Sequence, residues 1–376
     1  MSLHVRSIIL REIQMPLVEP FQISSGTADL RRMMLLETRD VDGVTAWSEC
    51  VAGERPYFSP ETVDTAWLAI REWIGPRVLG VPLDDPDAVL PRLNANLRGH
   101  LMAKAAVEMG VWGLAAERAG VSLATLVGGT RAQIATGISI GIQESPTRLV
   151  EKVRRSLAEG YQKAKIKVKP GADLAYLAAV REELGAEAPL MADANSAYTI
   201  GDFDQLAAFD RFDLMMIEQP LAWDDLVRHA ALQRRLTTPL CLDESITSVD
   251  RVDDMLTLGS GRIVNIKPGR VGGFTAARAI HDRCAAAGVP VWCGGMLESG
   301  IGRAYNVALA SLPNFVLPGD VSPSARYWQR DIVTPEWTMD AAGMVTVPLD
   351  RPGLGVTIDR DRVEDLTVRA ETVRAS

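Results

Sequence analysis

A strand-and-helix pattern that recurs about every 25 residues from residue 134 onward restricts the fold of this chain more than any other feature. Alternating strands and helices predict parallel strands with crossover helices, and eight evenly spaced runs predict a closed barrel. An open doubly wound sheet is a second possibility, but no GxGxxG fingerprint follows a run. The eight apolar runs are IATGISIGI (134–142), KAKIKVKPG (163–171), PLMADANSA (189–197), LMMIEQPLA (214–222), TPLCLDESI (238–246), RIVNIKPGR (262–270), VPVWCGGML (289–297) and NFVLPGD (314–320).

The chain before the barrel follows a different pattern. Residues 1–130 contain strand-like stretches joined through the turn signal Asp42-Gly43, followed by helical stretches, and are predicted to form an α+β domain. Residues 325–376 contain short strand-like pieces interrupted by proline and glycine, and we expect this tail to return to the first domain. The barrel is therefore assigned to residues 131–324.

Charged residues recur in phase with the strand runs, one near the end of each of five successive runs. They are Lys167, Asp193, Glu218, Asp243 and Lys267, at intervals of 24 to 26 residues. One repeat per interval places them at one height on neighbouring strands, at the carboxyl ends where barrel enzymes build their active sites. The plain alternative is an internal network of salt bridges, which explains one charged strand end more readily than five in phase.

The run KAKIKVKP places a lysine at every second position. Because alternate residues of a strand share a face, Lys165 and Lys167 are predicted to point into the barrel while the apolar residues between them pack against helices. Buried ammonium groups are costly unless carboxylates balance them. Three carboxylates from adjacent strands form the all-oxygen site that Mg²⁺ prefers. A lysine on each side of that site suits removal of a proton from carbon next to a carboxylate.

The composition limits the partners and the setting. The net charge is −8 without a basic patch, so we expect neither nucleic acid nor an anionic membrane surface as a partner. No uncharged apolar run reaches membrane-spanning length, and the N-terminus lacks a signal-peptide pattern. The four cysteines are scattered without zinc spacing and are predicted to be buried, which favours a reduced cytoplasmic setting.

Six segments in order resemble the enolase superfamily, muconate-lactonizing-enzyme subgroup: KIKVKP, MADANSAY, MIEQPL, CLDESI, NIKPGRVGG and VWCGGMLESGIGRA. More narrowly, the chain resembles the o-succinylbenzoate synthase / N-succinylamino acid racemase family over nearly its whole length. This resemblance implies a modified (β/α)₇β barrel capped by the α+β domain. It also implies a small-molecule carboxylate substrate, Mg²⁺ or another divalent cation such as Mn²⁺ as the cofactor, and a homo-oligomer, either a dimer or an octamer.

The resemblance assigns roles to particular residues. Lys167 matches the general acid/base on one face of the substrate, and Lys267 matches its partner on the opposite face. Asp193, Glu218 and Asp243 match the Mg²⁺ ligands. Further residues match groups that support these five or that contact the substrate. The supporting residues are Lys165, Asn195 and Glu244, the barrel contacts are Ser139, Gly295, Met296 and Asp320, and the cap contacts are Phe21, Ile23 and Tyr57.

Two reactions of the family start from the same enediolate, and both stay open. In o-succinylbenzoate synthesis, a step of the menaquinone pathway, Lys167 would remove the proton α to the carboxylate and then protonate the departing hydroxyl, while Lys267 stays a cation. In racemisation of an N-succinylamino acid or another N-acylamino acid, Lys167 and Lys267 would act alternately. Arg270 resembles the arginine of racemase-active members, and a fixed cation there would favour the neutral Lys267 that a two-base reaction needs.

Other reactions fit the sequence less well. Histidine-based racemases of the mandelate type are disfavoured, because the four histidines fall outside the predicted strand ends. Dipeptide epimerases carry a DxD motif on the last strand, where this chain reads Asp320-Val321-Ser322. Muconate cycloisomerases match NIKPGRVGG and WCGGMLESG less closely. Outside the superfamily, the alternatives are a Schiff-base lysine aldolase, against which the in-phase acids argue, and a non-catalytic binding barrel.

Overall fold

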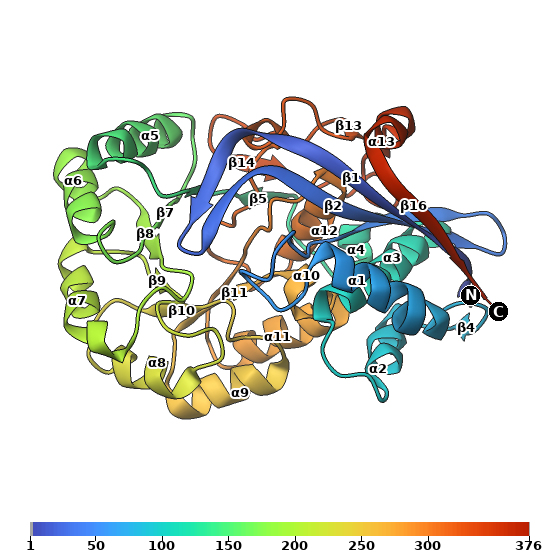
Figure 1. The fold of residues 1–376 in the computed structure, drawn as a ribbon, viewed down its shortest axis with the longest axis horizontal. Helices are drawn as coiled ribbons and strands as arrows, with labels where there is room; N and C mark the ends of the chain where they lie inside the picture. Colours follow the sequence, from blue (N-terminus) through green and yellow to red (C-terminus); the bar gives the residue numbers. More distant parts are fainter. Residues whose placement is uncertain (1–2, 376) are drawn as a thin grey trace.

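The computed structural model describes residues 3–375, which form a barrel and a cap lying side by side (Figure 1). In Figure 1 the parallel strands and their outer helices lie on the left, and an antiparallel sheet with its own helices lies on the right. This arrangement confirms the predicted fold class, a modified TIM barrel with an N-terminal α+β capping domain.

The cap is built on an antiparallel sheet. Its strands are β1 (Leu3–Ile23), β2 (Gly26–Asp40), β3 (Thr45–Cys50), β4 (Pro82–Leu83) and β16 (Thr367–Arg374). They run in the order β16-β1-β2-β3, with β4 pairing with β1, so the first and last segments of the chain share one sheet. At the turn between β2 and β3, Gly43 has a φ of 87° and Asp40 Oδ1 accepts hydrogen bonds from two backbone N–H groups. Gly43 of the predicted Asp42-Gly43 signal thus has the expected left-handed conformation, whereas the carboxylate that accepts these hydrogen bonds belongs to Asp40.

Helix α3 fixes the cap against the barrel. The cap helices are α1 (Val63–Ala69), α2 (Val89–Asn94), α3 (Leu101–Ala119) and α4 (Leu123–Val127). Buried Glu108 of α3 accepts hydrogen bonds at 2.9 Å from the backbone N–H groups of Phe274 and Thr275, at the start of a barrel helix. Gly113 lets α3 approach closely, since a Cβ there would lie 2.6 Å from the Tyr305 hydroxyl.

Seven parallel strands form the barrel sheet, in the chain order β6 to β12. They are β6 (Ile138–Ile140), β7 (Ala164–Lys167), β8 (Leu190–Asp193), β9 (Ile217–Glu218), β10 (Leu240–Leu242), β11 (Ile263–Ile266) and β12 (Val291–Cys293). The helices of this part are α5 (Pro146–Ala158), α6 (Leu174–Leu184), α7 (Phe203–Ala207), α8 (Leu226–Gln233), α9 (Val249–Leu258), α10 (Pro268–Val271), α11 (Phe274–Ala286) and α12 (Gly300–Ala310). The remaining strands are β5 (Gln133–Ala135), β13 (Val333–Thr334), β14 (Met344–Thr346) and β15 (Thr357–Ile358), and the last α-helix is α13 (Arg360–Leu366).

The last predicted run, NFVLPGD, closes the barrel through isolated bridges. Gly319 N donates to Ala135 O at 3.0 Å, and Asp320 N donates to Cys293 O at 2.8 Å. These contacts tie the segment to β12 on one side and to the chain before β6 on the other. Pro318 has no N–H to donate, so it cannot continue a ladder at its own position.

The alternation in β7 separates an apolar face from a charged one, as predicted. Ile166 is buried in one apolar cluster with Leu149 of α5 and Leu177 of α6. Lys165 and Lys167, on the opposite face, form ion pairs with carboxylates of the neighbouring strands. The outer face thus packs on helices while the lysines point inward.

The β1–β2 hairpin bends from the cap to the open end of the barrel (Figure 1). Its contacts with the barrel are direct: Ile142 N donates to Gln22 O at 2.9 Å, and Ser24 Oγ donates to Asn195 O at 3.1 Å. The tip of the hairpin therefore lies against the strand ends of β6 and β8.

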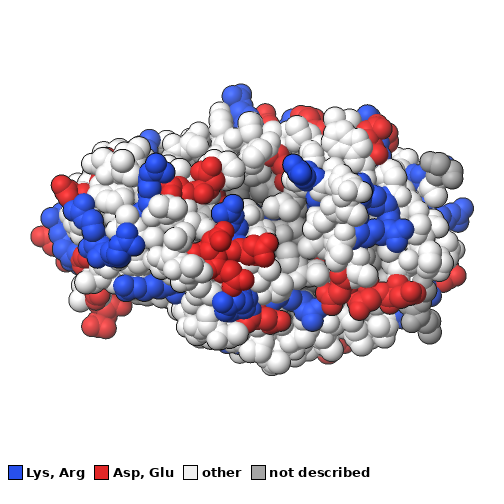
Figure 2. Space-filling model, turned by 90° about the horizontal axis from the view of Figure 1, so that it is seen from below, with Lys and Arg blue, Asp and Glu red and all other residues white. Residues whose placement is uncertain are grey.

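The cysteines lie inside the protein, and one face of the molecule shows how its charged side chains are distributed (Figure 2). All four cysteines are buried and free, as their scattered spacing predicts. Within residues 3–375, no helix has the length and apolar character to cross a bilayer. The face in Figure 2 mixes acidic and basic side chains around a central hollow and has no broad basic area.

Candidate active site

The five charged side chains that recur in phase lie at neighbouring strand ends. Lys167, Asp193 and Glu218 are aligned in the registers of β7, β8 and β9. Asp243 directly follows β10, and Lys267 follows β11 as the residue before α10. All five are buried, the most accessible being Lys167 at 8%. The fold therefore gathers the predicted catalytic and metal-binding residues at one end of the barrel.

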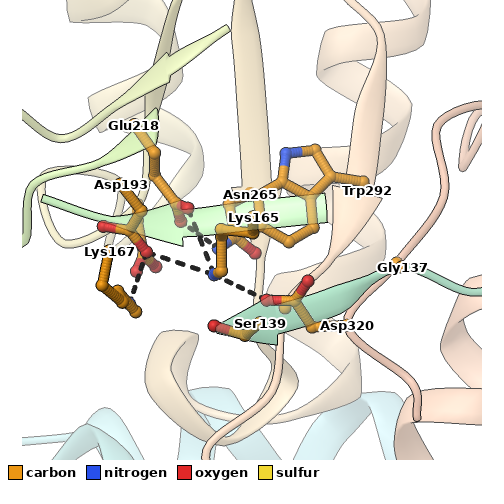
Figure 3. A network of polar contacts seen from close by, with 12 residues as sticks. Gly137, Ser139, Lys165, Lys167, Asp193, Glu218, Asn265, Trp292 and Asp320 are labelled. Carbon is orange, nitrogen blue, oxygen red and sulfur yellow. Dashed lines mark hydrogen bonds and ion pairs between the residues drawn. The ribbon is translucent and has the colours of Figure 1, made fainter. Parts of the chain in front are cut away.

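Lys165 lies at the centre of the network in Figure 3, among three carboxylates. Its Nζ is 2.5 Å from Asp320 Oδ2 and 3.2 Å from an oxygen of both Asp193 and Glu218. Burial acts to lower the pKa of Lys165, but these carboxylates raise it well above its ordinary value. Lys165 is therefore a fixed cation that neutralises the acids around it.

Lys167 extends from this network to the cavity. Its Nζ donates to Asp193 Oδ2 at 2.5 Å and to Asn195 Oδ1 at 2.7 Å. Asn195 Nδ2 in turn donates to Glu244 Oε1 at 3.1 Å. The φ of Asn195 is 42°, a left-handed conformation that asparagine tolerates better than most residues. The predicted supporting residues Asn195 and Glu244 thus form a chain of contacts leading to Lys167.

Lys267 is held on the other side of the acids. Its Nζ lies 2.7 Å from Asp243 Oδ2 and 4.4 Å from the ring centroid of Phe58 in the cap. Burial acts to lower the pKa of Lys267, but Asp243 raises it. Arg270 shares this carboxylate, with Nε 3.0 Å from Asp243 Oδ1 at an angle unsuited to a hydrogen bond. Its other guanidinium nitrogens donate to backbone carbonyls, so Arg270 also braces the strand ends.

The carboxylates offer an all-oxygen donor set in which neighbouring negative charges repel one another. Burial, reinforced by Asp193, raises the pKa of Glu218 to about 8. Burial, reinforced by Asp243, raises the pKa of Glu244 to about 8. Asp243 Oδ1 and Glu244 Oε2 are buried without a hydrogen-bond donor. A divalent cation would relieve this repulsion and supply the missing partner.

The same acids are engaged by lysines as the structure stands. Among residues 3–375, no three histidine, cysteine, aspartate or glutamate side chains are grouped as a metal site. Each predicted ligand contacts a lysine ammonium, which balances part of its negative charge. The donor chemistry nonetheless fits Mg²⁺, and Asp193, Glu218 and Asp243 are the residues that would hold it.

The sequence patterns do not single out two further residues of the network. Asn265 Nδ2 donates to Glu218 Oε1 at 2.6 Å. Asn265 lies two residues before Lys267, and this spacing could have indicated that its side chain also points into the barrel. Lys163 is fully buried, with Nζ 3.5 Å from the ring centroid of Trp292 and 3.5 Å from Asp320 Oδ1. Its place in the alternating lysine row is the signal that could have revealed it.

A cavity of about 430 Å³ lies between the strand ends and the cap, a volume suited to a small molecule. Lys167 and Lys267 both line it. Five of the seven predicted substrate contacts also line it, namely Phe21, Ile23, Tyr57, Gly295 and Met296. Ser139 and Asp320 lie outside its lining. Ser139 is in register with Lys165, one inward step below Lys167, and Asp320 pairs with Lys165 at that same depth.

Family models match both parts of the chain. Residues 148–362 match a model described as enolase C-terminal domain-like. Residues 5–128 match a model described as the N-terminal domain of mandelate racemase / muconate lactonizing enzyme.

Individual relatives are similar over nearly the whole chain. A Geobacillus kaustophilus protein named o-succinylbenzoate synthase is 50% identical over 367 residues, which are 98% of this chain and 97% of that protein. An Amycolatopsis protein named N-succinylamino acid racemase is 46% identical over 358 residues, covering 95% of this chain and 96% of that protein. A crystal structure of an enolase superfamily member from Listeria innocua superposes with a TM-score of 0.94 and 38% identity, covering 99% of both chains.

Proposed function

Because the chain belongs to the o-succinylbenzoate synthase / N-succinylamino acid racemase family of the enolase superfamily, we propose that it removes the proton α to a substrate carboxylate. The product is o-succinylbenzoate, a racemised N-succinylamino acid, or each in turn. One observation carries this proposal: Lys167 at the end of β7 and Lys267 directly after β11 line the same cavity. Between them lie three strands, β8, β9 and β10, each with a carboxylate at or directly after its end. An amine on each side of these acids suits proton transfer at either face of a substrate held between them.

The proposed cofactor is Mg²⁺, since enolase-superfamily sites combine a lysine or histidine base with one or two Mg²⁺ ions. Asp193, Glu218 and Asp243 would hold it, and Mn²⁺ or another divalent cation suits the same oxygens. When bound, the ion supplies positive charge next to the substrate carboxylate and so favours loss of the neighbouring proton. Lys165 keeps its charge in the same network, because carboxylates surround its ammonium.

Lys167 is the base that starts both reactions in this proposal. Asp193 and Asn195 hold its Nζ at the cavity wall, so the amine is oriented before a substrate arrives. In dehydration, the same Nζ carries the proton from the substrate carbon to the departing hydroxyl. One face of the substrate therefore suffices for that reaction.

Lys267 distinguishes the two reactions. In dehydration it stays an ammonium, held between Asp243 and the ring of Phe58, and its charge stabilises the electron-rich substrate. In racemisation it returns a proton to the face opposite Lys167, or removes one from that face in the reverse direction. Relatives with each of the two names resemble this chain to a similar degree, which supports keeping both reactions.

Arg270→Met is expected to reduce racemisation at least about tenfold more than dehydration. Only racemisation requires Lys267 to release and take up a proton, and Arg270 shares the Asp243 carboxylate with that lysine. The measurement is kcat/KM for both reactions in one preparation of the variant. Equal losses would leave Arg270 as a brace of the backbone carbonyls alone.

The direct test of the proposed function uses the purified protein with Mg²⁺. Its two assays follow formation of o-succinylbenzoate from its hydroxylated precursor and loss of optical rotation from N-succinyl-L-leucine. Leucine is chosen because apolar residues such as Leu30, Phe58 and Met102 contribute to the cavity lining. Activity in either assay supports the proposal and identifies the reaction. Inactivity in both overturns the substrate assignment.

Two further parts of the proposal concern setting and assembly. We place the protein in the cytoplasm, in keeping with four buried free cysteines. We also propose a homo-oligomer, dimer or octamer, acting on small carboxylates without a nucleic acid or membrane partner. Light scattering during size-exclusion chromatography measures the oligomeric state directly.

A further inference from the structure

Arg31 lines the same cavity as Lys167 and Lys267 but comes from the cap. It lies in β2, where its partner across the sheet is Met15 of β1. Only 8% of Arg31 is exposed. The cavity therefore has the two lysines of the proposed reaction in its barrel wall and a buried guanidinium in its cap wall.

The guanidinium of Arg31 has few partners within the protein. Its Nη2 donates to the backbone carbonyl of Met296 at 3.3 Å, whereas its buried Nε has no hydrogen-bond partner. In the part of the chain that the structure describes, no carboxylate forms an ion pair with it, and burial lowers its pKa. A buried cation without an anion is costly, so this position suits a ligand that supplies the negative charge.

The two buried acids that act most strongly on Arg31 have other partners. Glu49 accepts hydrogen bonds from backbone N–H groups at the start of α12, and burial raises its pKa to about 8. Glu298 has one oxygen bonded to an asparagine amide and the other 3.7 Å from Arg303 Nη2. Neither acid thus serves as a dedicated counterion for Arg31.

Arg31 also differs from the other basic residues that line the cavity. Lys167 and Lys267 each have a carboxylate oxygen at 2.7 Å or less. Arg55 is exposed to solvent, where its Nη1 lies 3.4 Å from the Tyr57 hydroxyl. Among the cavity-lining residues, Arg31 is therefore the cation that is both buried and without an acidic partner.

We infer that Arg31 binds the distal carboxylate of a succinyl group and so selects substrates with a second anionic end. The inference rests on the proposed function, because the candidate substrates of both reactions carry a succinyl group. In each, one carboxylate adjoins the carbon that loses its proton, and the succinyl carboxylate lies at the other end. The carboxylate next to the reacting carbon would bind near the lysines and the predicted metal ligands. The succinyl carboxylate would bind to Arg31 in the opposite wall of the cavity.

The chemistry of the pair fits this role. A guanidinium presents planar, paired N–H donors that match the two oxygens of a carboxylate, and the unpartnered Nε of Arg31 is one of them. Because the succinyl end is common to both substrates, one anchor explains how a single cavity can accept two otherwise different molecules.

The experiment compares N-succinyl-L-leucine with N-succinamoyl-L-leucine, whose neutral amide replaces the distal carboxylate at nearly the same size. Racemisation is measured at saturating Mg²⁺ for the wild type and for Arg31→Met. We expect the wild type to prefer the succinyl compound by about 10- to 100-fold in kcat/KM, mostly through KM. Arg31→Met should lose this preference and keep its rate on the amide. If the wild type catalyses only dehydration, the two leucine compounds are replaced by the hydroxylated precursor of o-succinylbenzoate and by the analogue of that precursor with an amide in place of the succinyl carboxylate.

Two matched variants sharpen the result. Arg31→Lys keeps the charge but loses the paired donors, so its preference should be intermediate. Arg55→Met should keep the wild-type preference. Equal losses on both compounds in Arg31→Met would overturn the inference and leave Arg31 as a brace of the Met296 carbonyl.

Measurements on the wild type alone also test whether the protein recognises the succinyl carboxylate, even if Arg31→Met does not fold. Equal rates on the succinyl and succinamoyl compounds would overturn the inference while the proposed function stands. Inactivity of the wild type on every succinyl compound would overturn the proposed function, and the inference with it.

Discussion

Replacing Lys167 with alanine is expected to lower kcat/KM for both dehydration and racemisation by at least about 10³-fold. Lys167 is the base with which both reactions begin, and its Nζ is oriented by Asp193 at 2.5 Å and Asn195 at 2.7 Å. Alanine leaves neither a base nor a cation at the end of β7. The measurement is kcat/KM for o-succinylbenzoate formation and for racemisation of N-succinyl-L-leucine in one preparation.

Lys169→Ala is the matched control for this variant. Lys169 belongs to the same alternating row but lies beyond β7, in a backbone bridge with Ala172, and outside the cavity lining. Its replacement should leave both rates within about twofold of the wild type. If Lys167→Ala lost racemisation but kept dehydration, the assignment of Lys167 as the shared base would be contradicted.

Chelation of divalent cations with EDTA is expected to reduce both activities below about 1%, and added Mg²⁺ to restore them. Without the ion, the substrate carboxylate would face the acids at the ends of β8, β9 and β10. The fold itself should survive, because lysines already contact these acids. Activity and the thermal unfolding midpoint, measured on the same chelated sample, separate the two effects.

Glu218→Gln provides a second approach to the same metal site. Removing one carboxylate charge should raise the Mg²⁺ concentration that gives half-maximal activity, without abolishing folding. Full activity in EDTA would contradict the metal assignment. If borohydride then trapped a lysine adduct with a carbonyl substrate, the Schiff-base alternative would replace it.

The barrel and its charged strand ends were predictable because one repeat determines both. A strand and helix of constant length return the chain to the same end of the sheet, so residues one repeat apart reach the same height. Lys167, Asp193 and Glu218 are aligned in neighbouring strands for this reason. The period of two in β7 likewise determines which side chains point inward.

The depth of a site residue along the barrel axis was harder to predict than the strand that carries the residue. Ser139 and Asp320 were expected to contact substrate, but the structure places both at the level of Lys165 and outside the cavity lining. Inward-facing residues lie two positions apart on a strand, and a shift by one such position determines whether a side chain lines the cavity or joins the ion-pair network beneath it. That shift depends on the stagger of the strands, which the sequence does not record.

Contacts between the cap and the barrel follow no local pattern. Arg31 reaches Met296 across 265 positions of the chain, and Phe58 lies over Lys267 from a loop of the cap. The unpaired charge of Arg31 exists because of how the two domains pack. Its environment could therefore be seen only in the folded chain.

Proton exchange in D₂O tests the central claim most directly, since two lysines that remove α-protons must replace them with deuterium. The purified protein is incubated with Mg²⁺ and either enantiomer of N-succinyl-leucine, and the α-proton is followed by NMR. We predict that the α-proton signal of both enantiomers disappears in the wild type, together with optical rotation, and that Lys267→Ala exchanges the α-proton of one enantiomer at most. Retention of the α-proton in both enantiomers would exclude the racemase reaction and leave only dehydration. Racemisation that survives loss of either lysine, or retention of the α-proton together with no dehydration, would contradict the two-lysine account.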